Sequence, residues 1–302
     1  MKIYNIKGNT YYFETKYAYM PFYKINENEI IMLDSGFFET DEKVIKELIS
    51  QYKFIVKSVI CSHAHVDHVG NNFWLKEQFN TEIIMPEYES ITCESMYNFK
   101  AFNLPFITKR MEKSYASNIC STDRKILSKE KVIEVFGHEF EIVQLPGHTH
   151  YHTGIITPDN VFYVGDSLMG EEEIIYTKIA YISDISVDLQ TKEKLREIKC
   201  DKYILAHKGI YDDLNEIIDE NIKYLEEQMK FIISVINKPM TMSEIFAEVF
   251  KKLEISSNVS TYILAEKMLK SYIYYLIDYG VVKIEVIDHS LKYNCNKHNA
   301  IE

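Results

Sequence analysis

The chain has 302 residues, of which 46% are hydrophobic, and its formal net charge is −11. This composition is that of an ordinary globular protein, with room for one sizeable core and a smaller appended unit. The acidic balance repels polyanions at long range, so bulk electrostatics do not favour binding to nucleic acid or to an anionic membrane.

The cysteines and the apolar runs restrict the class of protein further. The five cysteines are odd in number and form no C-x-x-C pair, which fits neither a disulfide framework nor a structural zinc site. No uninterrupted apolar run approaches the ~20 residues that span a bilayer, and polar residues interrupt the start of the chain. We therefore expect reduced thiols, a cytoplasmic location and no membrane contact.

Residues 1–60 predict short strands, then a helix, then a buried strand. Residues 9–14 are aromatic and β-branched, and the apolar run 29–33 is closed by Asp34-Ser35-Gly36. Residues 41–52 carry apolar side chains at helical spacing, and residues 54–61 form an apolar segment. This order of elements indicates a layered α/β architecture.

Several apolar segments each end just before a residue that can bind metal. The segments and the residues that follow them are 54–60 with His63, 140–145 with His148, 161–164 with Asp166, and 203–205 with His207. Loops at the carboxyl ends of strands commonly carry the chemistry of α/β folds, because rigid strands fix their positions. The pattern predicts one site at one edge of a sheet assembly.

Residues 85–130 interrupt this run of strands. The stretch is rich in Tyr, Phe, Met and Lys, has helical periodicity over 88–102, and is long for a loop. We expect a helical insertion that caps the site or makes a subunit contact in a homodimer. Its large apolar side chains are Tyr88, Met96, Tyr97, Phe99, Phe102 and Phe106.

After residue 213 the pattern becomes helical. Residues 214–236 form a long amphipathic segment, residues 241–244 read Thr-Met-Ser-Glu as at a helix start, and a further helix is expected over 259–279. Residues 281–293 predict a two-stranded hairpin. We expect a catalytic domain over 1–212 and a winged-helix-like, mainly helical domain over 213–302.

Residues 62–68, Ser-His-Ala-His-Val-Asp-His, gather three imidazoles and a carboxylate. Such groups suit Zn²⁺, Fe or Mn²⁺, and such a density is hard to explain by packing alone. In a tight turn, His63 and His65 can point to one side while Asp67 and His68 reach another. The cluster therefore predicts a site for two ions.

The sequence resembles the metallo-β-lactamase superfamily over residues 1 to about 212. The motifs that carry the resemblance are 63–68 (H-x-H-x-D-H), 145–149 (LPGHT), 165–167 (GDS), 206–209 (AHKG) and the early turn 33–36 (LDSG). The resemblance implies a four-layer αββα sandwich. It also implies a first metal held by His63, His65 and His148, a second held by Asp67, His68 and His207, and Asp166 bridging both.

Departures from the family pattern show which branches of the superfamily this chain resembles less. The antibiotic-degrading members usually have a thiolate where this chain has Asp166, which disfavours β-lactam cleavage. The flavodiiron branch has glutamate where this chain has His65, which disfavours membership of that branch. The third motif often continues as G-H-T-P-G-H, whereas residues 147–152 read Gly-His-Thr-His-Tyr-His. We expect His152 to orient a ligand and His150 to face solvent or substrate.

The resemblance implies a hydrolase whose two cations, about 3.5 Å apart, lower the pKa of a bridging water until it supplies hydroxide at neutral pH. Asp67 and Asp166 would orient that hydroxide and carry its proton to the leaving group. The same chemistry serves esters, thioesters, lactones and phosphodiesters, because each passes through an oxyanionic transition state. The motifs therefore do not name the substrate.

The C-terminal segment is similar to the winged-helix domain of a subgroup that includes glyoxalase II-like proteins and β-lactamase-like endoribonucleases. Its basic residues alternate with acidic ones and form no basic stripe, which disfavours nucleic acid. We rank a hydrolase of a small-molecule ester, thioester or lactone first, an endoribonuclease second, and a mononuclear-iron enzyme of the sulfur dioxygenase kind third. The expected cofactor is two divalent metal ions, with zinc preferred and iron or manganese as alternatives.

Overall fold

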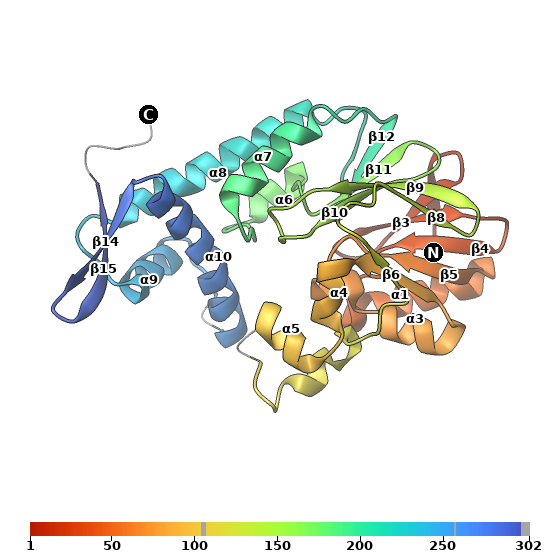
Figure 1. Cartoon of the computed structure of the whole chain (residues 1–302), viewed down its shortest axis with the longest axis horizontal. Coiled ribbons are helices and arrows are strands. Elements are labelled where there is room, and N and C mark those ends of the chain that lie inside the picture. The colour runs from red at the N-terminus through yellow and green to blue at the C-terminus, as the bar shows by residue number, and fades with distance from the viewer. Residues whose placement is uncertain (104–106, 257, 297–302) are drawn as a thin grey trace.

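The computed structural model describes residues 1–103, 107–256 and 258–296, so Phe106 of the predicted insertion lies outside the described residues. Two β-sheets lie face to face, with helices on the outer face of each (Figure 1). In the described part of the chain, no helix combines the length and the apolar character needed to cross a bilayer.

The first sheet has seven strands, in chain order across the sheet. They are β1 (Ile3–Lys7), β2 (Thr10–Glu14), β3 (Tyr19–Lys24), β4 (Glu29–Leu33), β5 (Ile55–Ile60), β6 (Glu82–Pro86) and β7 (Arg124–Ile126). Strands β1 to β4 pair antiparallel, and β4 to β7 pair parallel. Helices α1 (Phe38–Tyr52) and α3 (Asn72–Phe79) cover its outer face, where Ile45, Leu48 and Leu75 join one apolar core.

The second sheet has six strands, and β11 and β12 are its one parallel pair. In spatial order they are β13 (Ile210–Tyr211), β12 (Lys202–Leu205), β11 (Val161–Gly165), β10 (Thr153–Ile156), β9 (His138–Gln144) and β8 (Val132–Val135). Its outer face is covered by α7 (Ile185–Leu195) and the first turns of α8 (Asn215–Val235), through Leu195 and Ile218.

The four layers form because successive side chains of each strand point to opposite faces of its sheet. In β4, Ile31 and Leu33 enter the core between the sheets, while Met32 faces the helices. In β11, Tyr163 faces the first sheet and Phe162 faces the helical side. Successive side chains of a strand point to opposite faces, so a strand buried on both sides reads as a continuous apolar run. The expected αββα sandwich is confirmed.

Within the predicted insertion, the helices are α4 (Glu87–Cys93), α5 (Met96–Phe102) and the 3₁₀ helix η1 (Glu112–Asn118). The helical periodicity over 88–102 corresponds to two helices, because the Ser95 hydroxyl accepts a hydrogen bond from the Asn98 backbone N–H (3.1 Å) and starts α5. Phe99 is fully buried and anchors a small core, whereas Tyr97 is 86% exposed.

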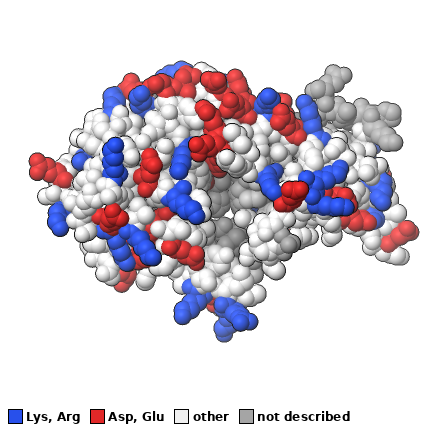
Figure 2. Space-filling view, turned by 180° about the vertical axis from the view of Figure 1, so that it is seen from behind, with Lys and Arg blue, Asp and Glu red and all other residues white. Residues whose placement is uncertain are grey.

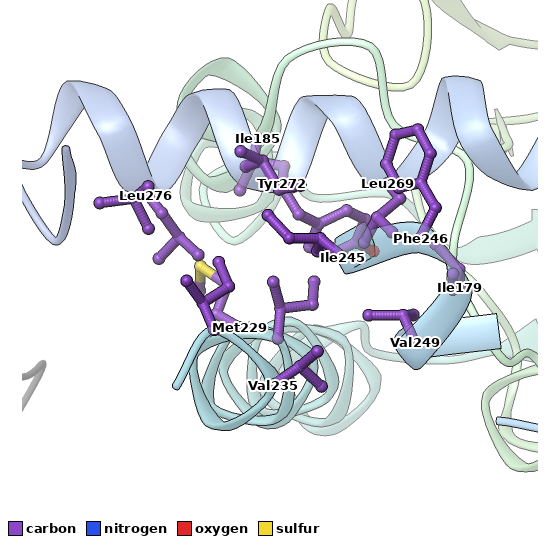
Figure 3. Packing of buried hydrophobic residues seen from close by; sticks show 14 of the residues in the cluster. Ile179, Ile185, Met229, Val235, Ile245, Phe246, Val249, Leu269, Tyr272 and Leu276 are labelled. Atoms are coloured by element: carbon purple, nitrogen blue, oxygen red, sulfur yellow. The ribbon is translucent and has the colours of Figure 1, made fainter. Parts of the chain in front are cut away.

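The C-terminal segment contains the predicted helices and hairpin: α8, α9 (Met242–Lys252), α10 (Val259–Asp278), β14 (Val282–Ile287) and β15 (Ser290–Cys295). The expected start of α9 is confirmed, because the Thr241 hydroxyl accepts from the Glu244 N–H (3.2 Å) while the Glu244 carboxylate accepts from the Thr241 N–H (2.6 Å). Ile245, Leu269 and Tyr272 are fully buried where α8, α9 and α10 meet (Figure 3).

Candidate metal centre

All seven predicted metal ligands lie at one edge of the sandwich. His63 and His65 follow β5, Asp67 and His68 lie in the short helix α2 (Val66–Val69), and His148, Asp166 and His207 follow β9, β11 and β12. The structure brings them into two groups whose candidate ligand atoms lie within 4.8 Å of one another: His63, His65, His148 and Asp166; and Asp67, His68, Asp166 and His207. Asp166 is common to both groups, as in the assignment that the resemblance implied.

In the first group, three imidazoles converge. Nδ1 of His65 lies 2.8 Å from Nε2 of His63 and 2.9 Å from Nε2 of His148. The Asp166 carboxylate is 3.3 Å from the His148 nitrogen. Burial lowers the pKa of His63 and His65 well below the usual value, and that of His148 to about 4; neighbouring imidazoles act in the same direction, and the nearby carboxylates oppose it. The three rings are therefore neutral at pH 7, which is the form that binds metal.

In the second group, two carboxylates face two imidazoles. Oδ2 of Asp166 lies 3.2 Å from Nε2 of His68 and 3.5 Å from Nε2 of His207, and Asp67 Oδ2 lies 3.4 Å from the same His207 atom. Burial opposes a charge on both rings, but Asp166 and neighbouring carboxylates raise the pKa of His68 and of His207 well above the usual value. This group favours positive charge at its centre, which a divalent cation would supply.

Two buried atoms of this cluster support the fit to metal. His68 Nε2 and Asp166 Oδ1 have no hydrogen-bond partner among the described residues, although nearly all buried polar atoms in proteins are paired. Metal coordination would satisfy both, and imidazole with carboxylate is the donor set of Zn²⁺, Fe and Mn²⁺. When bound, such ions lower the pKa of coordinated water and polarise the carbonyl or phosphoryl oxygen under attack.

Asp34, at the end of β4, orients the His68 ring. Its Oδ2 lies 2.8 Å from His68 Nδ1 and accepts hydrogen bonds from the hydroxyls of Ser62 (2.7 Å) and Tyr163 (2.6 Å). Its Oδ1 accepts from the Ser62 backbone N–H (2.7 Å). This network directs Nε2 of His68 towards the second group. In the sequence, Asp34 was visible only as part of the turn after an apolar strand.

His152 supports the loop that carries Asp166. Its Nε2 accepts from the Asp166 backbone N–H (3.1 Å), and its Nδ1 lies 3.2 Å from the Ser167 hydroxyl oxygen. Gly165 has φ 60°, and a Cβ there would lie 2.5 Å from His152 Nε2, so a side chain would displace the ring. The expected orienting role of His152 agrees with these contacts, and His150 is exposed as expected.

Helix α7 supports two of the ligand-bearing loops at once. Gly147, with φ 137°, packs so closely on α7 that a Cβ would lie 2.4 Å from the Asp188 Cα. On the same helix, Lys192 forms a buried ion pair with Asp188 and donates to the Ser167 carbonyl oxygen (3.2 Å). The loops after β9 and β11 are therefore fixed to one rigid element.

Glu89 of α4 connects the insertion to two ligand-bearing loops. Its carboxylate accepts hydrogen bonds from the Ala64 backbone N–H (3.0 Å) and from the Thr149 hydroxyl (2.6 Å), and its side chain is buried. Ala64 lies between two ligands and Thr149 follows a third. The sequence offered no signal for this role, because the partners lie 25 and 60 residues away.

A cavity of about 520 Å³ opens beside the cluster. The predicted ligands that border it are His65, Asp67, His148, Asp166 and His207. Residues of α8 and α10 form another part of its wall, and a space-filling view of the molecule shows a hollow in the middle of one face (Figure 2). A second cavity, of about 290 Å³, lies beside α4 and α5 and shares His65, Asn103 and Tyr181 with the first.

Comparisons with known proteins agree with this geometry. The model of the metallo-beta-lactamase superfamily matches residues 22–207. The chain is 28% identical over 196 residues to hydroxyacylglutathione hydrolase GloC of Haemophilus influenzae, a match covering 63% of this chain and 85% of that protein. It is 26% identical over 144 residues to a hydroxyacylglutathione hydrolase of Aliivibrio fischeri, where the match covers 47% of this chain and 44% of the relative.

Solved structures extend the likeness of fold to the C-terminal segment. A metallo-beta-lactamase family protein of Thermus thermophilus has a TM-score of 0.68 at 16% identity, over 92% of this chain and 94% of that chain. A beta-lactamase domain protein of Burkholderia ambifaria has a TM-score of 0.71 at 16% identity, over 98% of this chain and 94% of that one. The chain therefore belongs to the metallo-beta-lactamase superfamily and is a metallo-hydrolase of that fold.

Proposed function

We propose that this protein hydrolyses a small-molecule carboxylic ester, thioester or lactone with two divalent metal ions, preferably zinc. The observation that carries the proposal is the cavity of about 520 Å³ beside the two ligand groups. Cavities of this size bury most of the surface of a small molecule. The hydroxyacylglutathione hydrolases to which the chain is similar point to the same class of substrate.

In this proposal, His63, His65 and His148 hold the first ion, Asp67, His68 and His207 hold the second, and Asp166 bridges them. Asp67 and Asp166 orient the attacking water and carry a proton to the leaving group. Residues 1–212 form the catalytic domain, and residues 213–302 form a winged-helix-like domain of the glyoxalase II-like subgroup that packs against it. Glu89 and Asp34 act as positioning residues.

Charge pairing in the C-terminal segment favours a small molecule over RNA. Lys270 pairs with Glu266 (2.9 Å) and Lys292 pairs with Glu244 (3.1 Å). Phosphate binding needs clustered and unpaired Lys and Arg. On the face in Figure 2, basic and acidic side chains are interspersed over much of the surface.

A group of exposed basic residues in the insertion is the reason to keep an endoribonuclease as the second candidate. Lys109, Arg110 and Lys113 are close in sequence and exposed. Such a group is where a polynucleotide would bind if this chain cleaved RNA.

The experiment compares a panel of thioesters, esters and lactones with single-stranded RNA, using purified protein of known metal content. We expect metal-dependent hydrolysis of at least one acyl substrate, loss of that activity with a chelator, and RNA cleavage at background. Asp166→Ala is the inactive control. The triple variant Lys109→Ala, Arg110→Ala, Lys113→Ala should hydrolyse the acyl substrate normally.

The opposite pattern would establish the ribonuclease instead. It consists of metal-dependent RNA cleavage whose binding weakens steeply as salt rises, its loss in the triple variant, and no turnover of any thioester, ester or lactone. Protein with no transition metal after reconstitution with Zn²⁺, Fe²⁺ and Mn²⁺ would contradict both candidates.

A further inference from the structure

The cavity beside the metal ligands has a wall that the hydrolytic chemistry does not require. On α10, Ser260, Leu264 and Met268 border it, and on α8, Asn221 and Leu225 do. Residues four apart lie on the same face of a helix. One continuous face of each helix therefore borders the cavity, so the C-terminal segment takes part in the substrate site.

Most of this wall is apolar. Leu225 is fully buried, and Leu168, Ile179 and Ile182 from the segment after Asp166 add buried aliphatic side chains. The amide of Asn221 is already bonded within the protein, since it accepts from the Met169 N–H and donates to the Met169 carbonyl oxygen, both at 2.9 Å. The wall thus offers mainly hydrocarbon contacts.

The wall also lacks an unpaired cation within the described residues. Lys192 is the one Lys or Arg among the described residues that line the cavity, and its ammonium is paired with Asp188 and bonded to the Ser167 carbonyl oxygen. The undescribed internal positions 104–106 and 257 are Leu, Pro, Phe and Ser. Lys267 of α10 donates to the Asn103 carbonyl oxygen at 2.8 Å. An anionic group placed against α8 and α10 would therefore meet no unpaired Lys or Arg among the described residues that line the cavity.

We propose that this cavity holds a neutral hydrocarbon acyl chain, so that the substrate is an ester or thioester whose acyl group carries several methylenes. Leu264 and Met268 are then specificity-determining residues that set the accepted chain length. This inference rests on the proposed function and assigns its acyl side. A short polar acyl group, such as a hydroxyacyl group of two or three carbons, would leave the wall of α8 and α10 uncontacted.

The reaction places the acyl chain and the leaving group on different sides of the scissile carbonyl. The oxygen of water forms a new bond to the carbonyl carbon, the C–S or C–O bond breaks, and one proton of that water ends on the leaving thiolate or alkoxide. The carboxylic acid product releases its own proton to solvent. In this proposal the contacts with α10 act on the acyl half, so the length of the acyl chain is the variable that tests them.

The test is a series of straight-chain acyl thioesters of N-acetylcysteamine, from acetyl to decanoyl, together with the lactoyl thioester. We expect kcat/KM to rise about threefold to fourfold per methylene until the cavity is filled, the gain expected from moving a methylene out of water. The lactoyl thioester should react no faster than the propionyl thioester.

Two variants locate the effect. Leu264→Trp should lower kcat/KM for the octanoyl thioester at least about tenfold more than for the acetyl thioester, because the indole would exclude two or more methylenes, each worth about threefold to fourfold. Leu264→Ala should move the best substrate to a longer chain. Unchanged circular dichroism, urea unfolding and metal content show that both variants fold. Tyr274→Trp, at an exposed position on the same helix, is the matched control.

The outcomes separate the two proposals. Thioester hydrolysis with a flat or falling dependence on chain length, or an equal loss for all chain lengths in Leu264→Trp, would overturn the acyl pocket and leave the hydrolase standing. No hydrolysis at any chain length, with metal bound, would overturn the proposed function and the acyl pocket together.

Discussion

The ligand edge of the sandwich and the C-terminal segment have interiors of opposite character. At the ligand edge, the buried groups are polar, and those that support the candidate ligands are paired, as Asp34 is with Ser62 and Tyr163. In the C-terminal segment, the interior consists of aliphatic and aromatic side chains such as Ile245, Leu269 and Tyr272 (Figure 3). Both regions border the same cavity.

This difference separates two tasks. Buried polar networks rigidly orient ligands, but burying those groups costs free energy unless all are paired. Apolar packing supplies most of the stability of a domain, and apolar positions tolerate replacement by other apolar side chains of similar volume. We infer that the ligand edge sets the reaction, while the C-terminal segment supplies stability and the shape of the substrate wall.

The largest expected effect is at the ligand edge. His63→Ala and Asp166→Ala should each lower kcat/KM by at least about 10³-fold, since removal of a residue that merely orients a ligand already costs about 10- to 100-fold. His150→Ala, at an exposed position in the same motif region, should stay within about twofold. Steady-state kinetics and elemental analysis measure both. Equal losses for His150 and His63 would mean that the ligand assignment in the third motif is wrong.

Next in size is a cavity in the C-terminal core. Leu269 is fully buried, so Leu269→Ala should lower the free energy of unfolding by about 2–5 kcal/mol. Val259→Ala, where the side chain is 74% exposed on the same helix, should change it by no more than about 0.5 kcal/mol. Urea unfolding measures both. If Leu269→Ala also removed metal from the folded protein, the ligand edge and the C-terminal segment would not have separate tasks.

Asp34 is the test of the polar network. Asp34→Asn keeps the side-chain shape, and asparagine tolerates the backbone angle of φ 63° found there, but an amide cannot accept all the hydrogen bonds of the carboxylate. We expect metal affinity to fall about 10- to 100-fold, measured by competition with a chelator. Asp212→Asn, at an exposed loop position that pairs with Lys202, is the matched control and should leave affinity unchanged.

The smallest expected effect is at a helix start in the C-terminal segment. Thr241→Ala removes the hydroxyl that accepts from the Glu244 N–H and should cost about 1 kcal/mol of unfolding free energy. Thr241→Ser keeps the hydroxyl and should recover most of it. Neither variant should alter metal content. A change in metal content would show that the start of α9 affects the ligand edge, which would contradict the division of tasks between the two regions.

The sequence alone determined the layered architecture and the candidate ligands, because both depend on local patterns. Apolar runs identified β4, β5 and β11, and residues 63–68 placed three imidazoles and a carboxylate directly after a strand. Helical periodicity and the Thr241 capping signal located α8, α9 and α10 within one or two residues.

The family resemblance already implied how the candidate ligands divide, but only the tertiary structure decided which side chains support and border them. Asp166 serves both groups because β5 and β11 belong to different sheets that end at the same edge, and pairing between distant strands leaves no local pattern. The Glu89 carboxylate accepts from the Ala64 backbone N–H, and Gly147 packs against the backbone of Asp188; both contacts join residues far apart in sequence and leave no local pattern. The face of α10 that borders the cavity through Leu264 and Met268 depends on how that helix packs against distant parts of the chain, which leaves no local pattern in the sequence.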